Sequence, residues 1–322
     1  MIRPTRRGVA LLLVAGVATG LAVAFGARSL GAIVVPSAVA LVAGVVQVWL
    51  TPTPAVERAD PPDGHADREA GVTLRFDVDD PFPATVDDRL SPGVVAVEGL
   101  PAEAVVGEEA VHYRLRFERR GKQTVGPATV RYTDVLGLVA ARTTAGTAAS
   151  VLVYPPVRPL PPTLDDQLRA GVAGQSRTER DEFDGLREYV RGDALRNLNW
   201  KASAKRDDLI VTEFTGARPA RTVTVAVGGA PEDVSEMATA AASVVAALHD
   251  LGAVVALRTP DGEVEAGPDA PERAFEHLAT VGPGAVPDGE AAVRVEASGG
   301  EARVSVAGEE RVAVGGDRRA TA

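Results

Sequence analysis

Two long apolar runs open the chain. Residues 8–25 contain no charged side chain, and residues 30–50 contain none either, with only Ser37 and Gln47 as polar breaks. Each run approaches the ~20 residues that cross the hydrocarbon core of a bilayer. Because only four residues separate the runs, the pattern predicts a transmembrane hairpin with spans over 8–26 and 30–50.

The arginines around these runs predict their orientation. Arg3, Arg6 and Arg7 precede the first run, whereas Arg28 alone lies in the turn. Basic residues favour the cytoplasmic side, so we expect a multi-pass protein of the cell membrane with its N-terminus and its soluble domains in the cytoplasm. A cleaved signal peptide is the alternative, since an Arg-rich start before an apolar run fits that pattern too. The second run would then enter from outside and still leave the bulk of the chain in the cytoplasm.

Short alternating runs follow the hairpin. Residues 51–70 are rich in Pro and Asp without apolar periodicity, which predicts a linker. Residues 71–155 then alternate apolar and polar positions between Gly and Pro turns, as in a β-sandwich-like domain. His112, Arg114 and Arg116 should point outward from one such strand. The expected strands of this domain include residues 72–78, 111–117, 128–132 and 150–154.

The second half of the chain has a different pattern. A Pro-rich connector is expected over 156–174, followed by a charged segment over 175–215 and an α/β region over 221–322. In that region a strand, an Ala-rich helix and a second strand form a βαβ unit, which predicts two parallel strands. The fold class predicted is therefore membrane-anchored α+β. The elements expected after residue 220 are strands at 221–227, 253–258, 291–295 and 302–306, and helices at 232–250 and 271–280.

Charge and composition restrict the chemistry. The net charge is −10, the chain has only three lysines, and it has no cysteine. Disulfides, thiol catalysis and thiolate metal sites are thereby excluded. The acidic, lysine-poor composition is typical of halophilic proteins, so the negative charge need not describe a partner.

Residues 187–206 carry a net positive charge, opposite to that of the whole chain, with six basic residues and two acidic ones. We expect helical turns over 186–191 ending at Gly192, then Asp193 as the N-cap of the next turn. An ion-paired structural joint with a buried Trp200 accounts for these residues most simply. The alternatives are a docking surface and a catalytic site in which Asp193 acts as general base beside Arg196 or Lys201.

Two blocks of sequence stand out by the order and spacing of their motifs. The first lies in the β-domain and comprises Arg119-Arg120-Gly121, Gly126-Pro127, Asp134-Val135-Leu136-Gly137-Leu138 and Val153-Tyr154-Pro155. The second comprises Glu182-Phe183, Leu186-Arg187-Glu188-Tyr189, Gly192-Asp193, Arg196, Asn199-Trp200-Lys201 and Ser203-Ala204-Lys205. Together they resemble the domain-of-unknown-function 58 (DUF58) family of membrane-anchored proteins, and the second block is similar to the family signature. The chain departs mildly from the family pattern, with Val135 where Pro is frequent and Lys205 where Arg is frequent.

The resemblance implies partners rather than a reaction. Members of that family accompany MoxR-type AAA+ ATPases and von Willebrand factor A proteins, and their C-terminal part often resembles a von Willebrand A fold. That fold binds a divalent metal through Asp-x-Ser-x-Ser after its first strand, whereas here Gly228-Gly229-Ala230 follows it. Asp233 and Ser235 come later, where helix capping is favoured over metal ligation. We therefore expect a truncated, metal-free version of the fold.

These observations predict a non-enzymatic, membrane-tethered scaffold or adaptor, with no cofactor, no metal and no nucleic-acid partner. The four histidines lack metal-ligand spacing, so solvent-facing or capping roles are expected for them, and neither GxxxxGK[ST] nor GxGxxG after a strand is present. The alternative is an enzyme with a site around Asp193, Arg196 and Lys201. The expected interaction residues are Arg187, Tyr189, Gly192, Asp193, Arg196, Trp200, Lys201, Ser203 and Lys205.

Overall fold

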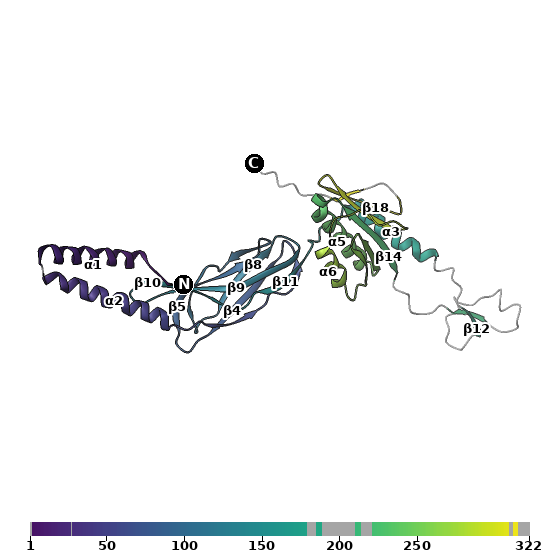
Figure 1. Cartoon of the computed structure of the whole chain (residues 1–322). Helices are drawn as coiled ribbons and strands as arrows, with labels where there is room; N and C mark the ends of the chain where they lie inside the picture. Colours follow the sequence, from purple (N-terminus) through teal and green to yellow (C-terminus); the bar gives the residue numbers. More distant parts are fainter. Residues whose placement is uncertain are drawn as a thin grey trace. The chain divides into compact units, whose positions relative to one another are not determined.

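The computed structural model of the chain describes residues 2–26, 28–178, 185–188, 210–213, 221–308 and 312–314. The chain divides into two compact units, Met1–Tyr154 and Pro155–Ala322 (Figure 1). Each unit has its own β-sheet and its own buried apolar side chains.

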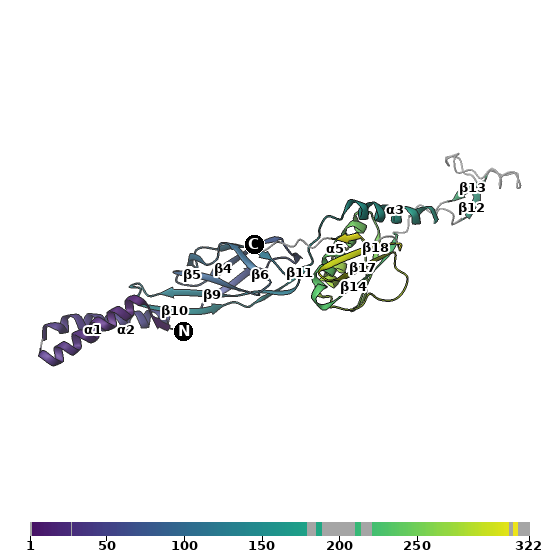
Figure 2. The ribbon, with the colours of Figure 1, turned by 90° about the horizontal axis from the view of Figure 1, so that it is seen from above.

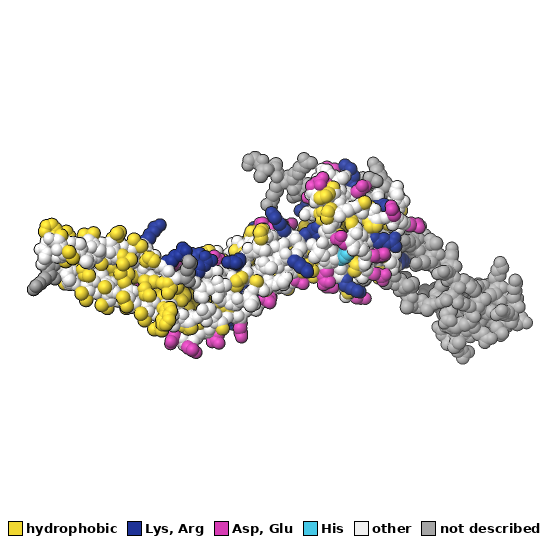
Figure 3. Space-filling model, in the orientation of Figure 1, with side chains coloured by type: hydrophobic (Ala, Val, Ile, Leu, Met, Phe, Trp, Pro, Cys, Tyr) yellow, Lys and Arg dark blue, Asp and Glu magenta, His cyan; other side chains and the backbone are white. Residues whose placement is uncertain are grey.

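The first unit begins with two apolar helices, α1 (Arg6–Phe25) and α2 (Gly31–Leu50), joined through the 3-10 turn η1 (Arg28–Leu30). Each helix has 20 residues and is therefore about 30 Å long, which is long and apolar enough to cross a membrane. Large apolar side chains are exposed all along them, for example Val23 at 82% and Trp49 at 73% (Figure 3). Such a continuous apolar surface fits lipid rather than water.

The rest of the first unit is two packed sheets, which agrees with the β-sandwich-like domain expected from the sequence. The larger sheet has seven strands, in the order β1-β10-β9-β11-β3 with β5 and β7 continuing from β9. The smaller sheet has the order β2-β4-β8-β6. The larger sheet contains β1 (Ile2–Pro4), β3 (Gly64–His65), β5 (Phe82–Leu90), β7 (Ala102–Val106), β9 (Gly121–Thr133), β10 (Val139–Ala145) and β11 (Ala149–Tyr154). The smaller contains β2 (Ala55–Ala59), β4 (Glu69–Asp77), β6 (Val94–Glu98) and β8 (Val111–Phe117).

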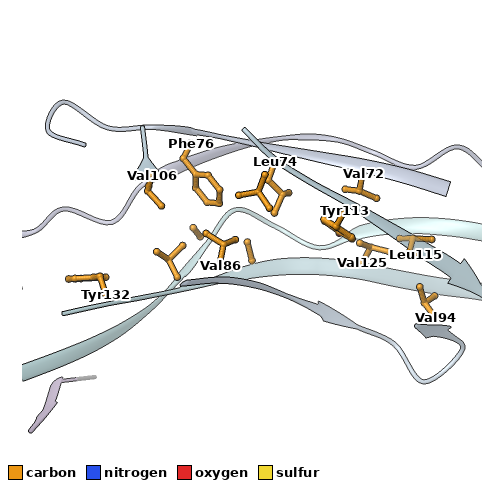
Figure 4. Packing of buried hydrophobic residues seen from close by; sticks show 14 of the residues in the cluster. Val72, Leu74, Phe76, Val86, Val94, Val106, Tyr113, Leu115, Val125 and Tyr132 are labelled. Atoms are coloured by element: carbon orange, nitrogen blue, oxygen red, sulfur yellow. The ribbon is translucent and has the colours of Figure 1, made fainter. Parts of the chain in front are cut away.

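Alternating residues of these strands form the core between the two sheets (Figure 4). Strand β8 buries every second residue, and its other side chains, His112, Arg114 and Arg116, are exposed as predicted. Leu74 of the smaller sheet lies near Val86 of the larger one and Leu115 lies near Val125, and all four are fully buried. The period-2 pattern of the sequence therefore identified the inner face correctly.

The linker expected over 51–70 is wrong. Ala55–Ala59 is strand β2 and pairs with β4, and Gly64–His65 is strand β3 and pairs with β11. The half-buried positions of β2 are Val56 and Arg58, so a charged residue stands where the alternation requires an apolar one. Because of this charged residue, hydrophobic periodicity did not predict the strand.

The second unit contains a six-stranded sheet in the order β16-β15-β14-β17-β18-β19. Strand β14 is parallel to both β15 and β17, which confirms the predicted βαβ unit, and the remaining pairs are antiparallel. In order along the chain the strands number 3-2-1-4-5-6 across the sheet, so the order reverses between β14 and β17. The strands are β14 (Thr222–Gly229), β15 (Val254–Thr259), β16 (Gly262–Ala266), β17 (Val293–Ser298), β18 (Glu301–Val306) and β19 (Val312–Val314).

Three helices pack against this sheet: α3 (Pro162–Thr178), α5 (Val234–Asp250) and α6 (Glu272–Thr280). Figure 2 shows α3 and α5 beside strands β17 and β18. Helix α3 corrects the expectation of a Pro-rich connector over 156–174. Pro162 is compatible with a first helical turn, and Leu164, Leu168 and Val172 supply a buried stripe at four-residue spacing.

Candidate functional site

The segment singled out from the sequence lies almost wholly outside the described residues. This holds for Tyr189, Gly192, Asp193, Arg196, Trp200, Lys201, Ser203 and Lys205. Arg187 lies in strand β12 (Gly185–Glu188), which pairs antiparallel with β13 (Ile210–Glu213).

Strand β12 overturns the helical turns expected over 186–191, at least as far as Glu188. Its register pairs Arg187 with Val211 and Glu188 with Ile210. The backbone hydrogen bonds come from a partner more than 20 residues later, which a local propensity argument cannot detect. Glu188 and Ile210, the described residues on either side of this part of the segment, are therefore direct partners.

The described residues that join the helices to the β-domain form a bonded site, and we call it the joint. Its first part is Thr5, which lies between β1 and α1. The Thr5 hydroxyl accepts a hydrogen bond from the Gly8 amide (3.1 Å), which caps the helix, and donates to the Gly137 carbonyl (2.6 Å). The Thr5 amide donates to the Leu138 carbonyl (2.9 Å). One residue therefore fixes both the start of α1 and the loop between β9 and β10.

That loop, Asp134–Leu138, is held by the buried carboxylate of Asp134. Its Oδ1 accepts a hydrogen bond from the Val139 amide (2.6 Å) and its Oδ2 accepts one from the Leu136 amide (3.1 Å). Asp134 is only 3% exposed. A carboxylate that accepts two backbone N–H groups is a strong, geometrically specific support for a tight turn.

Helix α2 contacts the same loop near its end. The Gln47 side-chain oxygen accepts from the Val135 amide (3.2 Å), and the Tyr132 hydroxyl donates to the Val48 carbonyl (3.4 Å). A Cβ on Gly44 would lie 3.0 Å from the Asp134 carboxylate, so glycine permits the close approach. Both helices are thus bonded to the loop Asp134–Leu138.

A second polar cluster, the buried triad, consists of Arg58, Asp88 and Tyr113 inside the β-sandwich. The Arg58 guanidinium pairs with both carboxylate oxygens of Asp88, and the Tyr113 hydroxyl donates to Asp88 Oδ2 (2.5 Å). The Asp88 side chain is fully buried and that of Arg58 is 7% exposed. Gly126 lies beside the guanidinium in a left-handed conformation (φ 98°). A buried charge pair of this kind needs every partner in place.

The electrostatics of the buried triad favour structure over catalysis. Burial, reinforced by Asp88, raises the pKa of the Tyr113 hydroxyl well above its ordinary value. Burial alone would lower the pKa of Arg58, but Asp88 outweighs it and the net direction is upward. The hydroxyl stays protonated and the guanidinium stays charged at neutral pH, so neither group can exchange a proton with a substrate.

A third place that could hold a ligand is the point where the strand order reverses, at the carboxyl ends of β14 and β17. A shallow cavity of about 460 Å³ lies there, lined by Gly228, Gly229 and Ser298 among others. Residues 283–286 cross it, and Gly229 and Gly284 exchange two backbone hydrogen bonds (2.8 and 3.0 Å). A Cβ on Gly228 would lie 2.3 Å from the Val286 amide nitrogen. The glycines at the end of β14 thus admit a segment of the chain itself.

Asp233 lies at the N-cap position of α5, as predicted, but its side chain does not cap the helix. Its Oδ1 instead accepts from the Gly300 amide in the β17–β18 turn (2.7 Å), while Oδ2 is buried without a hydrogen-bond partner. Among the described residues no group of three His, Asp or Glu side chains could hold a metal ion. Asp233 therefore joins the helix start to a turn.

The histidines differ in their surroundings. His112 is exposed and lies 3.0 Å from the Thr73 hydroxyl, and His277 is bonded to the Thr259 hydroxyl (2.7 Å). His249 corrects the expectation of a solvent-facing role, because it is 9% exposed and packs edge-on against Phe275. Its Nε2 bonds the Ala266 carbonyl (3.1 Å) and must carry the proton, while Nδ1 is buried without a partner.

The stability of the second unit is expected to fall as the pH is lowered below neutral. Burial lowers the pKa of His249 from its ordinary 6.5, against smaller opposing effects of the Ala266 carbonyl and Asp250. The unfolded chain therefore binds the proton first, and stability declines below pH ~6.5 until the folded pKa is passed. Hydrogen exchange of α5 amides across this range measures the slope. His249→Gln should flatten it and His112→Gln should not; an unchanged slope in His249→Gln would contradict the assignment.

Comparisons with known proteins give few matches. No model of a known protein family matches the chain. It is 27% identical over 168 residues to the uncharacterized protein YeaD of Bacillus subtilis (strain 168), which covers 48% of this chain and 42% of that protein. Two solved structures are more distant: the PKD domain of an M14-like peptidase from Thermoplasmatales archaeon SCGC AB-540-F20 and the SrpA adhesin R347E mutant from Streptococcus sanguinis. The first is 14% identical with a TM-score of 0.23 and covers 32% of this chain and 97% of that one. The second is 11% identical with a TM-score of 0.22 and covers 44% and 85%.

Proposed function

We propose that the chain is a membrane-tethered cytoplasmic scaffold or adaptor of the DUF58 type. The observation that carries the proposal is the joint, in which Thr5, Gln47 and Asp134 bond the two apolar helices to the β-domain. A freely hinged anchor would need only a flexible tether after residue 50. Here strand β1, ahead of α1, is itself paired with β10, so the helices and the β-domain form one body. A fixed body at a membrane surface suits the presentation of a docking site.

The second unit is proposed to be a degenerate, metal-free von Willebrand A-like domain. Its strand order 3-2-1-4-5-6, with an antiparallel strand at the β16 edge, supports this proposal. Residues 283–286 support it as well. They cross the point where the strand order reverses, which a ligand-binding relative would need to keep open.

The proposed docking residues are those of the signature segment, from Arg187 to Lys205, and the proposed partners are a MoxR-type AAA+ ATPase and von Willebrand A proteins. These partners would work with the chain in complex assembly or envelope processes. The pairing of β12 with β13 supports a docking role, because it brings the two ends of residues 189–209 together. The orientation proposed, with both units in the cytoplasm, rests on Arg3, Arg6 and Arg7 ahead of α1.

Replacing Arg196 by alanine tests the docking role. We expect capture of the ATPase by the full-length chain from native membranes to fall about tenfold or more, as for loss of a charged contact residue in an interface. Arg169→Ala is the matched control, because Arg169 is an exposed arginine of α3 that pairs with Asp165 one helical turn earlier. Undiminished capture by a folded Arg196→Ala protein would refute docking through this segment. Turnover of a small molecule that depends on Asp193 would favour an enzyme instead.

A further inference from the structure

The outer face of the larger sheet of the first unit carries three arginines beside the helices. Arg131 of β9 and Arg142 of β10 are direct register partners, and Arg3 of β1 lies opposite Ala140, two residues from Arg142. All three are exposed and line a groove of about 530 Å³ together with Thr85, Thr133 and Ala140. Figure 3 shows Lys and Arg side chains gathered where the helices meet the β-domain.

The register places two positive charges opposite each other. Like charges so placed on neighbouring strands repel, and Arg131 and Arg142 are such a pair in a chain whose net charge is −10. Glu103 and Glu109 line a neighbouring hollow together with Arg131, and Asp87 lies farther along β5. Arg142 also bonds the Thr129 hydroxyl (3.4 Å). An anion in the groove would be shared by both guanidinium groups and would remove the repulsion.

The position of the groove indicates where that anion comes from. The tip of the β9–β10 hairpin exposes two large apolar side chains, Val135 at 85% and Leu136 at 57%. This tip is bonded to the residue before α1 and to the last turn of α2. It therefore lies beside the two helix ends next to the β-domain, at the depth where the proposed membrane spans leave the bilayer. Exposed apolar side chains at that level suit the boundary between headgroups and acyl chains.

Arg131 and Arg142 lie three residues from the ends of this loop, at Asp134 and Val139, which is about 10 Å along a strand. Arg3 is nearer, because it pairs next to Val139. The headgroup layer is roughly 5–8 Å deep on each side of a bilayer, so long side chains at this distance reach it. Arg7 adds charge at the tip itself, since its guanidinium lies close to Gly137.

We propose that Arg3, Arg131 and Arg142 form a binding site for the headgroup of an anionic phospholipid in the leaflet next to the β-domain. The inference rests on the proposed membrane tether and goes beyond it, because it makes the chain selective for acidic lipid. The phosphate would lie between the paired arginines, while the acyl chains stay in the bilayer beside Val135 and Leu136.

The test uses the full chain in nanodiscs of equimolar phosphatidylglycerol and phosphatidylcholine. Mass spectrometry of the protein released into mild detergent gives the ratio of the two lipids that it retains. We expect retention of phosphatidylglycerol in preference to phosphatidylcholine. The preference of the Arg131→Gln/Arg142→Gln protein should fall about twenty-fivefold, at roughly fivefold for each arginine near an anionic surface.

The control is Arg75→Gln/Arg116→Gln, which removes the same charge from exposed positions of the smaller sheet. An equal loss in this control, or no loss in the groove variant, would overturn the site. So would displacement of the retained lipid by an excess of inorganic phosphate, which would assign the groove to a soluble anion. Failure of the tether is seen separately, because the unmodified chain would then not enter nanodiscs at all.

Discussion

Replacing Asp88 by alanine is expected to lower the free energy of unfolding of the β-domain by about 3–5 kcal/mol. The substitution leaves the Arg58 guanidinium as an uncompensated charge between the sheets and removes the acceptor of the Tyr113 hydroxyl. Both partners are buried, so water cannot replace the lost carboxylate without opening the sandwich. This is the largest single effect we expect in the first unit.

Hydrogen exchange of the β8 and β9 amides in the purified full chain measures this loss. Asp87→Ala is the matched control, because Asp87 lies on the outer face of the same strand and its Oδ1 accepts from the Asp88 amide. Tyr113→Phe keeps the ion pair and should cost only about 1–2 kcal/mol. If Asp88→Ala and Asp87→Ala were equally stable, the buried triad would have no structural role.

The second large effect is expected at Gly8, where even alanine should open the joint. A Cβ built on Gly8 lies 2.1 Å from the Leu138 carbonyl oxygen, a backbone atom that also accepts from the Thr5 amide. Helix α1 must therefore move away, and the bonds of Thr5 to the loop are lost with it. At about 1 kcal/mol for each bond, exchange of the Thr5 amide should accelerate on the order of tenfold to a hundredfold.

Alanine at Gly16 or Gly20 of the same helix provides the comparison. A Cβ at either position meets nothing within 4 Å, so these variants should exchange like the unmodified chain. Equal protection in Gly8→Ala would mean that the contact between α1 and the loop yields without loss. Equal deprotection in Gly16→Ala would point to a general effect on the helix rather than to the joint.

Hydrophobic patterning predicted most of the elements that bury apolar side chains. The two N-terminal helices, strand β8 and the β14–α5–β15 unit follow from unbroken or periodic apolar runs. Some of the strands that were missed, among them β2 and β5, have a polar residue at an inward position. Arg58 of β2 is the clearest case, because its burial depends on Asp88, 30 residues later.

The site was predicted less well than the fold, for a physical reason. The bonded residues of the joint are far apart in the sequence. Thr5 lies 132 and 133 positions before Gly137 and Leu138, and Gln47 lies 88 positions before Val135. A sequence read locally shows a threonine before an apolar run and an aspartate before a turn, which are ordinary capping signals. The charge excess over 187–206 was conspicuous in the sequence, but the residues expected to interact there, from Tyr189 to Lys205, lie outside those that the structure describes.

The pairing of β1 with β10 sets an order for folding. Ile2–Pro4 is synthesised before the two apolar helices, whereas its partner Val139–Ala141 emerges well over a hundred residues later. Both helices therefore exist before that partner does. The edge of the sheet next to the helices is completed only after them, and folding of the β-domain is what fixes the hairpin in place.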